Sequence, residues 1–344
     1  MSWKLWWKLP GKQTCHSRLA FLTLALLVPA TGWGFDYFQP LPAQPPFPAD
    51  NPPTAAKIAL GKKLFFDPAL LGADSRMSCN QCHILSDGGD DNRALSLGQN
   101  GKLSRRSAPT LWNIGFQMVL YWDGRATSLE AQTLDHLRDP LVTKMRSVGA
   151  AVQYLADSEE YGRLFAAAFP GGNAVTGEHL AMAMASFERS LLAPDSPFDR
   201  FMGGDKTALS ESAKRGMQAF NEVGCLACHF GTNFAGPAPG PAMGLGDGFY
   251  ELFPNHLGSR YETQYGLADD LGRFEYTGDP GEKYMWRVPP LRNIALTAPY
   301  FHNGSVDTLP EAVRVMAKTQ LKKVLDEGTV EDIVAFLNSL TGEI

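Results

Sequence analysis

Two short stretches decide the fold of this chain: Cys79-Asn80-Gln81-Cys82-His83 and Cys225-Leu226-Ala227-Cys228-His229. Each supplies two thiols that can form thioethers with the vinyl groups of a haem, followed by an imidazole that can bind its iron. A structural zinc site or a pair of disulfides is the alternative use of four cysteines. Because two CxxCH motifs rarely arise together by chance, the sequence predicts two covalently bound haem c groups. The attachment sites are then Cys79, Cys82, Cys225 and Cys228, and the iron ligands His83 and His229.

The N-terminus predicts export. A basic segment precedes the apolar run from Leu19 to Ala30, which is too short to span a bilayer comfortably. We interpret residues 1–34 as a signal peptide, whose cleavage would also remove Cys15; a retained N-terminal anchor is the alternative. Because haem c is attached outside the bacterial cytoplasm, the expected location is the periplasm.

Charge and length narrow the class of protein further. The 344 residues carry a net charge of −5, and loss of the basic signal makes the mature chain more acidic still, which argues against a nucleic-acid surface. No later stretch is apolar enough for a membrane span. The mature length suits two domains better than one.

Helical patterns dominate the mature chain, and strand signals are few. Thr127-Ser128-Leu129-Glu130 has the spacing of a capping box and should open a helix that ends near Leu137. The other predicted helices cover 54–66, 148–168, 177–193, 210–222, a segment from Thr308, and 329–340. The chain is therefore predicted to be mainly α, with two cytochrome c-like haem domains.

Three segments break the helical pattern. Residues 36–53 are rich in Pro and Phe and predict an extended strap over a domain surface. Residues 193–206 indicate a domain boundary. Residues 231–248 are rich in Gly and Pro and predict a surface loop.

Further stretches extend over nearly the whole mature chain. They are Leu60–Asp67, Ser107–Thr110, Tyr121–Ala126, Tyr261–Gln264, Gly272–Phe274, Val288–Asn293 and Ala298–Gly304. In sequence and order they resemble the bacterial dihaem cytochrome c peroxidase family, which includes the methylamine-utilisation enzyme MauG. The resemblance implies two haem domains packed face to face. It implies peroxide chemistry in an N-terminal domain of residues 35–198, and electron entry in a C-terminal domain of residues 199–324. The last helix, 325–344, should return to the N-terminal domain.

The resemblance assigns a sixth ligand at the second haem. Relatives of the peroxidase branch use a Met fourteen residues after the His of the PYFH motif, which is His302 here, and that position is Met316. A thioether ligand favours ferrous iron and suits a site that accepts electrons. MauG has Tyr at this place, so Met316 favours the peroxidase branch. Without the resemblance, Met316 would be taken as a core residue of an amphipathic helix.

The first haem departs from the family at position 99. Many members place a His sixteen residues after the CxxCH histidine, where it binds the iron until the other haem is reduced. Here Ser96-Leu97-Gly98-Gln99 puts Gln at that position. Gln is a poor iron ligand, so we expect a first haem that is open to peroxide without prior reduction.

The acid–base group also differs. Gln132 matches a Gln of the family that lies over the first haem, but the Glu that relatives place shortly after it is missing from Asp139–Met145. His136 lies four residues after Gln132, on the same helix face, and its imidazole could replace the carboxylate. Two alternatives stay open: a partly exposed helix residue near Asp135 and Asp139, or a direct ligand of the iron.

Trp122 matches a Trp that lies between the two haems in the family, where an indole can relay an electron; a large core aromatic at the domain interface is the alternative. The Asp123–Arg125 segment is expected to shape the turn. The resemblance also implies a calcium ion between the domains, bound partly by backbone carbonyls near Thr297 and Pro299. Many relatives have Asn where this chain has Ser107, which would remove one calcium ligand.

The leading functional prediction is a periplasmic peroxidase that reduces hydrogen peroxide with electrons from a small c-type cytochrome or a copper protein (a cupredoxin). One alternative is an enzyme of the MauG type, which oxidises side chains of a partner protein. Another is a dihaem electron carrier without turnover. Family members are often homodimers.

Overall fold

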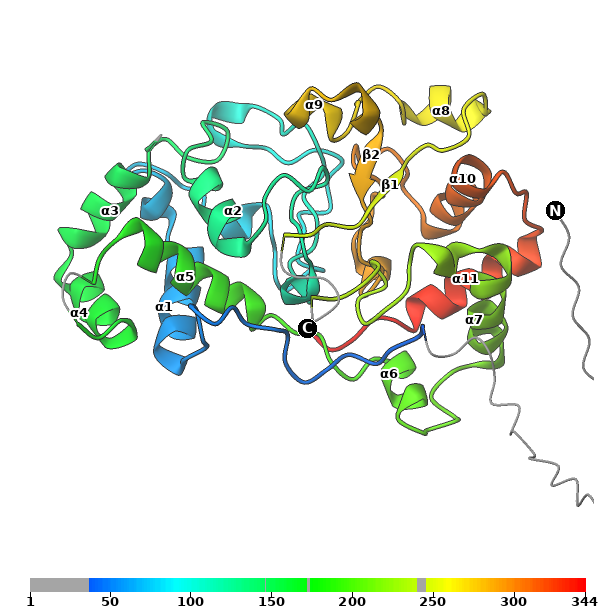
Figure 1. The fold of residues 1–344 in the computed structure, drawn as a ribbon, viewed down its shortest axis with the longest axis horizontal. Coiled ribbons are helices and arrows are strands. Elements are labelled where there is room, and N and C mark those ends of the chain that lie inside the picture. Colours follow the sequence, from blue (N-terminus) through cyan, green and yellow to red (C-terminus); the bar gives the residue numbers. More distant parts are fainter. Residues whose placement is uncertain (1–36, 146, 172–173, 240–245) are drawn as a thin grey trace, which may run out of the picture. The chain divides into compact units, whose positions relative to one another are not determined.

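The structure is a computed structural model, and it describes residues 37–344 except for residues 146, 172–173 and 240–245 (Figure 1). The predicted signal peptide and Cys15 lie outside the described residues. The described residues belong to one compact unit. No helix among them is long and apolar enough to cross a membrane.

The described chain is mainly helical, as predicted. Its α-helices are α1 (Ala55–Phe66), α2 (Leu129–His136), α3 (Val148–Ala156), α4 (Glu159–Ala168), α5 (Gly177–Arg189), α6 (Pro197–Met202), α7 (Glu211–Val223), α8 (Arg260–Tyr265), α9 (Phe274–Thr277), α10 (Leu309–Leu321) and α11 (Glu327–Asn338). Strands β1 (Tyr250–Leu252) and β2 (Met285–Arg287) form an antiparallel pair. Both CxxCH motifs begin with a short 3-10 helix, Cys79–Gln81 and Cys225–Ala227.

Hydroxyl caps set the starts of several helices, and two of them correct the sequence prediction. The Ser128 side chain, and not Thr127, caps α2 by accepting a hydrogen bond from the Ala131 N–H at 3.1 Å. Glu130 instead binds the buried Arg189 guanidinium with both carboxylate oxygens, at 2.6 and 2.9 Å. The predicted helix 148–168 is two helices, because Ser158 caps a new start at α4.

Two hydrophobic cores follow each other along the chain. The first contains α1 and α5, which cross where a Cβ on Gly61 would clash with the Ala183 carbonyl. The second contains α7 and α11, which cross where a Cβ on Gly216 would clash with the Asp332 carbonyl. In each core the helix that precedes a CxxCH motif approaches a later helix through a glycine, so the two CxxCH motifs lie in structurally similar units.

The position of the last helix differs from the prediction. We expected residues 325–344 to return to the N-terminal domain, but α11 packs on α7 in the second core (Figure 1). Its apolar face, formed by Val330, Ile333, Phe336 and Leu337, is buried there. The tail behind α11 reaches the end of the first domain, where the Glu343 N–H donates to the Pro194 carbonyl at 2.9 Å. The physical reason is that α11 has the same role in the second core as α5 in the first: each packs on the helix that precedes a CxxCH motif.

The Pro-rich N-terminal segment connects the two cores. Phe38 is buried in the second core, with its ring centroid 5.7 Å from that of Phe336. Asn51 lies against the first core, where its amide donates to the Glu130 carboxylate at 2.8 Å. The predicted strap therefore runs from one core to the other. The predicted boundary at 193–206 contains the short helix α6, whose Phe198 belongs to the second core.

Candidate functional site

The first CxxCH motif opens onto a cavity of about 440 Å³, which we call the first cavity. Helix α2 contributes Gln132 and His136 to its lining, and the segment before α2 contributes Trp122 and Arg125. The structure thus brings together the predicted residues of the first site. Those that line the cavity are Cys79, Cys82, His83, Trp122, Gln132 and His136.

His83 is oriented as an iron ligand should be. Its Nδ1 lies 3.1 Å from the Pro109 carbonyl oxygen and 3.3 Å from that of Gly89. A carbonyl oxygen only accepts, so Nδ1 carries the hydrogen and the Nε2 lone pair is free to bind a metal. Burial lowers the pKa of His83, which keeps the ring neutral as ligation requires.

His136 faces the same cavity at the end of α2. Its ring packs edge-on against Tyr121, with centroids 5.4 Å apart. Burial, followed by the charges of His83 and Arg125, lowers the pKa of His136 to about 3. The prediction that His136 shares a pocket with Gln132 is therefore supported by its position.

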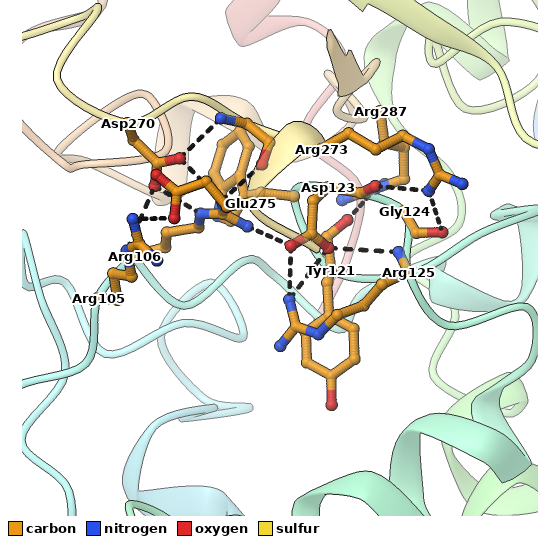
Figure 2. Close-up of polar contacts among 12 residues, drawn as sticks. Arg105, Arg106, Tyr121, Asp123, Gly124, Arg125, Asp270, Arg273, Glu275 and Arg287 are labelled. Atoms are coloured by element: carbon orange, nitrogen blue, oxygen red, sulfur yellow. Dashed lines mark hydrogen bonds and ion pairs between the residues drawn. The ribbon is translucent and has the colours of Figure 1, made fainter. Parts of the chain in front are cut away.

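Arg125 is a feature of this cavity that the sequence reasoning did not single out. Its guanidinium lies over the Tyr121 ring, 3.4 Å from the centroid (Figure 2). Nη1 donates to both carboxylate oxygens of Asp123, at 3.0 and 2.9 Å, and Asp123 also accepts from Arg106 at 2.5 Å. Arg125 thus shapes the turn, as expected, and in addition lines the cavity beside His136. Because Arg125 belongs to a turn motif, the sequence did not indicate that its side chain also lines the cavity.

Gln99 lies apart from these residues. It is buried, and its amide donates to the Ser75 hydroxyl at 2.9 Å and to the Val142 carbonyl at 3.2 Å. Its neighbour Gly98, and not Gln99 itself, is among the residues that line the first cavity. At the position where many relatives carry an iron ligand, this chain therefore has a side chain that hydrogen bonds hold outside the first cavity.

The second CxxCH motif opens onto a cavity of about 190 Å³, the second cavity. It is lined by Cys225, Cys228 and His229 and, from α10, by Met316. His229 Nδ1 lies 2.9 Å from the Phe234 carbonyl oxygen, which again leaves Nε2 free. Phe234 is fully buried in the second core, so the predicted surface loop 231–248 begins as part of the site.

The chemistry of both cavities fits a c-type haem. All four cysteines are free, and burial raises the pKa of Cys79 and Cys225 to about 12, so these thiols are neutral. The described part of the chain contains no cluster of three or more His, Cys, Asp or Glu side chains of the kind that binds zinc. Each cavity pairs two thiols with one metal-ready imidazole, which is the donor set for thioether attachment and iron binding.

Trp122 and Arg287 line both cavities. The Trp122 indole N–H donates to the Ser107 carbonyl at 2.9 Å, and its ring centroid lies 6.4 Å from that of His302. His302 is buried and stacks on Trp286 with centroids 4.2 Å apart. Trp122 therefore lies between the two sites, as predicted.

The segment of the predicted calcium ligands lies near Ser107. The Ser107 N–H donates to the His302 carbonyl at 2.8 Å, which joins the two segments. The Thr297 hydroxyl donates to the Ile294 carbonyl at 3.2 Å, and Pro299 follows two residues later. These contacts do not test calcium binding, which stays a prediction.

Comparison with known proteins identifies the family. The model of the di-haem cytochrome c peroxidase family matches residues 55–207, and that of a RoxA-like, cytochrome c-like family matches residues 285–320. Cytochrome c551 peroxidase of Pseudomonas aeruginosa is 39% identical over 89% of this chain and 84% of its own length. Methylamine utilization protein MauG of Methylophilus methylotrophus is 32% identical over 86% of each chain.

A solved structure has the same fold. The crystal structure of a MauG-like protein associated with microbial copper homeostasis superposes with a TM-score of 0.72 and 27% identity, covering 91% of this chain and 96% of that one. A mainly helical protein with two haem c sites belongs to the class of dihaem c-type cytochromes. This chain belongs to the di-haem cytochrome c peroxidase family, so it is an oxidoreductase that acts on peroxide.

Proposed function

We propose that this protein is a periplasmic peroxidase that converts H2O2, two electrons and two protons into two molecules of water. The electrons come from a small c-type cytochrome or a copper protein. The observation that carries the proposal is the difference between the two cavities. The first is lined by Gln132, His136 and Arg125, whereas the second is lined by Met316 and mostly apolar side chains.

The first cavity is the place of the peroxide reaction. A haem bound there, attached through Cys79 and Cys82 and held by His83, would supply the iron for the reduction of peroxide. Cleavage of the O–O bond also needs a group that takes a proton from one oxygen and returns it to the other. His136 is neutral at physiological pH and can perform this transfer, while Gln132 orients the peroxide by hydrogen bonding. The nearby Arg125 charge stabilises the negative charge that develops on the leaving oxygen.

The second cavity receives the electrons. His229 and Met316, which line this cavity, would hold a haem bound there, and a thioether ligand would raise its potential so that it could accept electrons from the donor. Trp122 lines both cavities and relays electrons between them. The tethering of Gln99 to Ser75 supports a first site that needs no prior reduction.

A calcium ion held by the carbonyls of Thr297 and Pro299, and a homodimer, complete the proposal. Metal analysis of the purified holoprotein tests the first, and light scattering tests the second. About one calcium per chain is the expected result. Loss of peroxidase activity on chelation, restored by added calcium, would show that the ion matters for turnover.

The main experiment is H2O2-dependent oxidation of a reduced small c-type cytochrome by the holoprotein. It is started once from the diferric and once from the half-reduced protein. Fast turnover from both forms is expected. Turnover only after half-reduction would refute the open first site, and no turnover from either form would refute the peroxidase.

A second candidate is oxidation of side chains in a partner protein, favoured by the likeness to MauG over 86% of each chain. The presence of Met316 beside His229 counts against it, because the MauG branch has Tyr at that place. Absence of turnover with every small donor, together with haem spectra that respond to peroxide, would favour this function. No response to peroxide at all would leave a dihaem electron carrier.

A further inference from the structure

Arg287 occupies an unusual place for a charged side chain. It ends β2, is only 3% exposed, and lines both cavities. Its backbone N–H donates to the Trp122 carbonyl at 2.9 Å, and its Nε–H donates to the Tyr121 carbonyl at 2.9 Å. Nη1 donates to the Gln117 side-chain oxygen. The guanidinium is therefore fixed between the two sites by the segment that carries Trp122.

Arg287 forms no ion pair with any described residue: the charge of Asp123 acts on it from a distance, but that carboxylate is already paired with Arg106 and Arg125. The side chain donates to two neutral oxygens, and none of the ion pairs of the described chain includes it. The neighbouring arginines differ. Arg106 pairs with Asp123 and Asp270 (Figure 2). Arg273 pairs with Glu282. Burial accordingly lowers the pKa of Arg287 to about 10.

A buried guanidinium without an anion is costly, since desolvation of the charge is not offset by an ion pair. Its side chain has five N–H groups, and the described residues supply two neutral acceptors for them. Such a residue indicates an anion that the protein chain does not contribute. The two cavities that Arg287 lines are the places where such an anion would lie.

We propose that Arg287 is the shared internal counter-charge for haem carboxylates, pairing with a propionate of the haem in each cavity. Haem carries two propionates, and the Nη hydrogens of Arg287 that are not used by Tyr121 and Gln117 can donate to their carboxylates. The inference rests on the presence of the two haems, and not on peroxide turnover. It makes Arg287 a cofactor-binding residue that links the electrostatics of both sites to the position of Trp122.

A positive charge beside a haem stabilises the ferrous state, because that state carries one positive charge fewer. Removing the charge of Arg287 should therefore lower the reduction potentials of both haems together. A purely structural role would not move two potentials in the same direction in a protein that keeps its fold. Lysine, which keeps the charge but donates as a point, should restore most of the shift.

The test is a redox titration of the holoprotein followed by the visible spectra of the two haems. The variants are Arg287→Gln, Arg287→Lys and, as a charge control, Arg138→Gln at the exposed end of α2. Two haems per chain are first verified for each variant. We expect both potentials to fall in Arg287→Gln, a smaller fall in Arg287→Lys, and none in Arg138→Gln. The propionate bending modes in the resonance Raman spectrum should shift in Arg287→Gln.

Unchanged potentials and Raman modes in a fully loaded Arg287→Gln protein would overturn the proposal. A fall in the reduction potential of one haem alone would overturn the proposal that both haems share Arg287. If Arg287→Gln does not fold, the test uses Arg287→Lys. Potentials and Raman modes equal to those of wild type would then overturn the proposal, because replacing the guanidinium by an ammonium group changes the hydrogen bonds to a bound propionate. All of these readouts are independent of turnover, so a failed peroxidase assay would not affect them.

Discussion

The two haem halves of the molecule share a framework and differ in what faces the haem. In both, a helix before CxxCH crosses a later helix at a glycine, Gly61 against Ala183 and Gly216 against Asp332. In both, the histidine of the motif directs Nδ1 to a backbone carbonyl. The repeated unit therefore accounts for how a haem is held, but not for what it does.

The two cavities differ in the residues that line them in addition to the CxxCH motif. The short helix α2 brings a histidine and an amide to the first cavity, and the adjoining turn adds an arginine. The longer helix α10 brings Met316 to the second cavity. One copy of the unit is thus equipped for proton transfer and the other for electron transfer. Four sets of variants test this comparison, and one of them addresses the framework that the two copies share.

The largest effect is expected from His136→Ala. If His136 moves the proton during O–O cleavage, peroxidase turnover should fall by about 100- to 10,000-fold. Stopped-flow spectra with H2O2 measure the step directly. Asp135→Asn, at the exposed neighbouring position, serves as the control and should keep wild-type rates. Turnover in His136→Ala that stays near wild type would assign proton transfer to another group.

The two glycine crossings should be equivalent. Gly61→Ala and Gly216→Ala each force a Cβ against a backbone carbonyl, which should cost about 3 kcal/mol of unfolding free energy. Gly162→Ala in α4 is the matched control, because nothing lies within 4 Å of the new Cβ. It should stabilise the protein by about 0.5–1 kcal/mol. Thermal unfolding of the holoproteins measures all three, and a tolerated Gly216→Ala would break the structural equivalence.

Met316→Ala should affect the second haem alone. Loss of the thioether is expected to lower its reduction potential and to make its iron high-spin, while the first haem keeps its spectrum. Met316→His should restore the low-spin spectrum but not the high potential. Electron paramagnetic resonance and redox titration follow both changes. A second haem that stays low-spin in Met316→Ala would show that another residue is the ligand.

The smallest effect is expected from Gln99→His. Although many relatives bind iron from this position, its side chain here is directed to Ser75 and Val142, away from the first cavity. The variant should retain an open first haem and turn over from the diferric form at close to the wild-type rate, because the side chain at this position is not among those that line the first cavity. A low-spin first haem in the variant would show that this segment can move to the iron.

Local sequence signals predicted much of the site. The spacing in CxxCH placed two thiols and an imidazole together, and Gln132 and His136 share a cavity because they are one helical turn apart. The starts of α1 and α10 follow from the capping residues Thr54 and Thr308. The start of α2 was displaced by one residue, since both Thr127 and Ser128 can cap a helix and the Glu130 carboxylate binds Arg189 instead of completing a capping box.

These local sequence signals do not predict long-range packing. An amphipathic face does not say which partner it covers, so the sequence could not show that α11 packs on α7. Nor could it show that Phe234, in a Gly- and Pro-rich loop, is buried and accepts the hydrogen bond of His229.

The sequence by itself determined where each haem is attached, which imidazole faces it and that the chain is mainly helical, because these depend on residues close together along the chain. Tertiary structure alone decided that Arg125 joins His136 in the first cavity and that Gln99 is held away from it. It also placed the unpaired charge of Arg287 against both cavities. These relations join segments far apart in the sequence, and only the packing of the two cores brings such segments into contact.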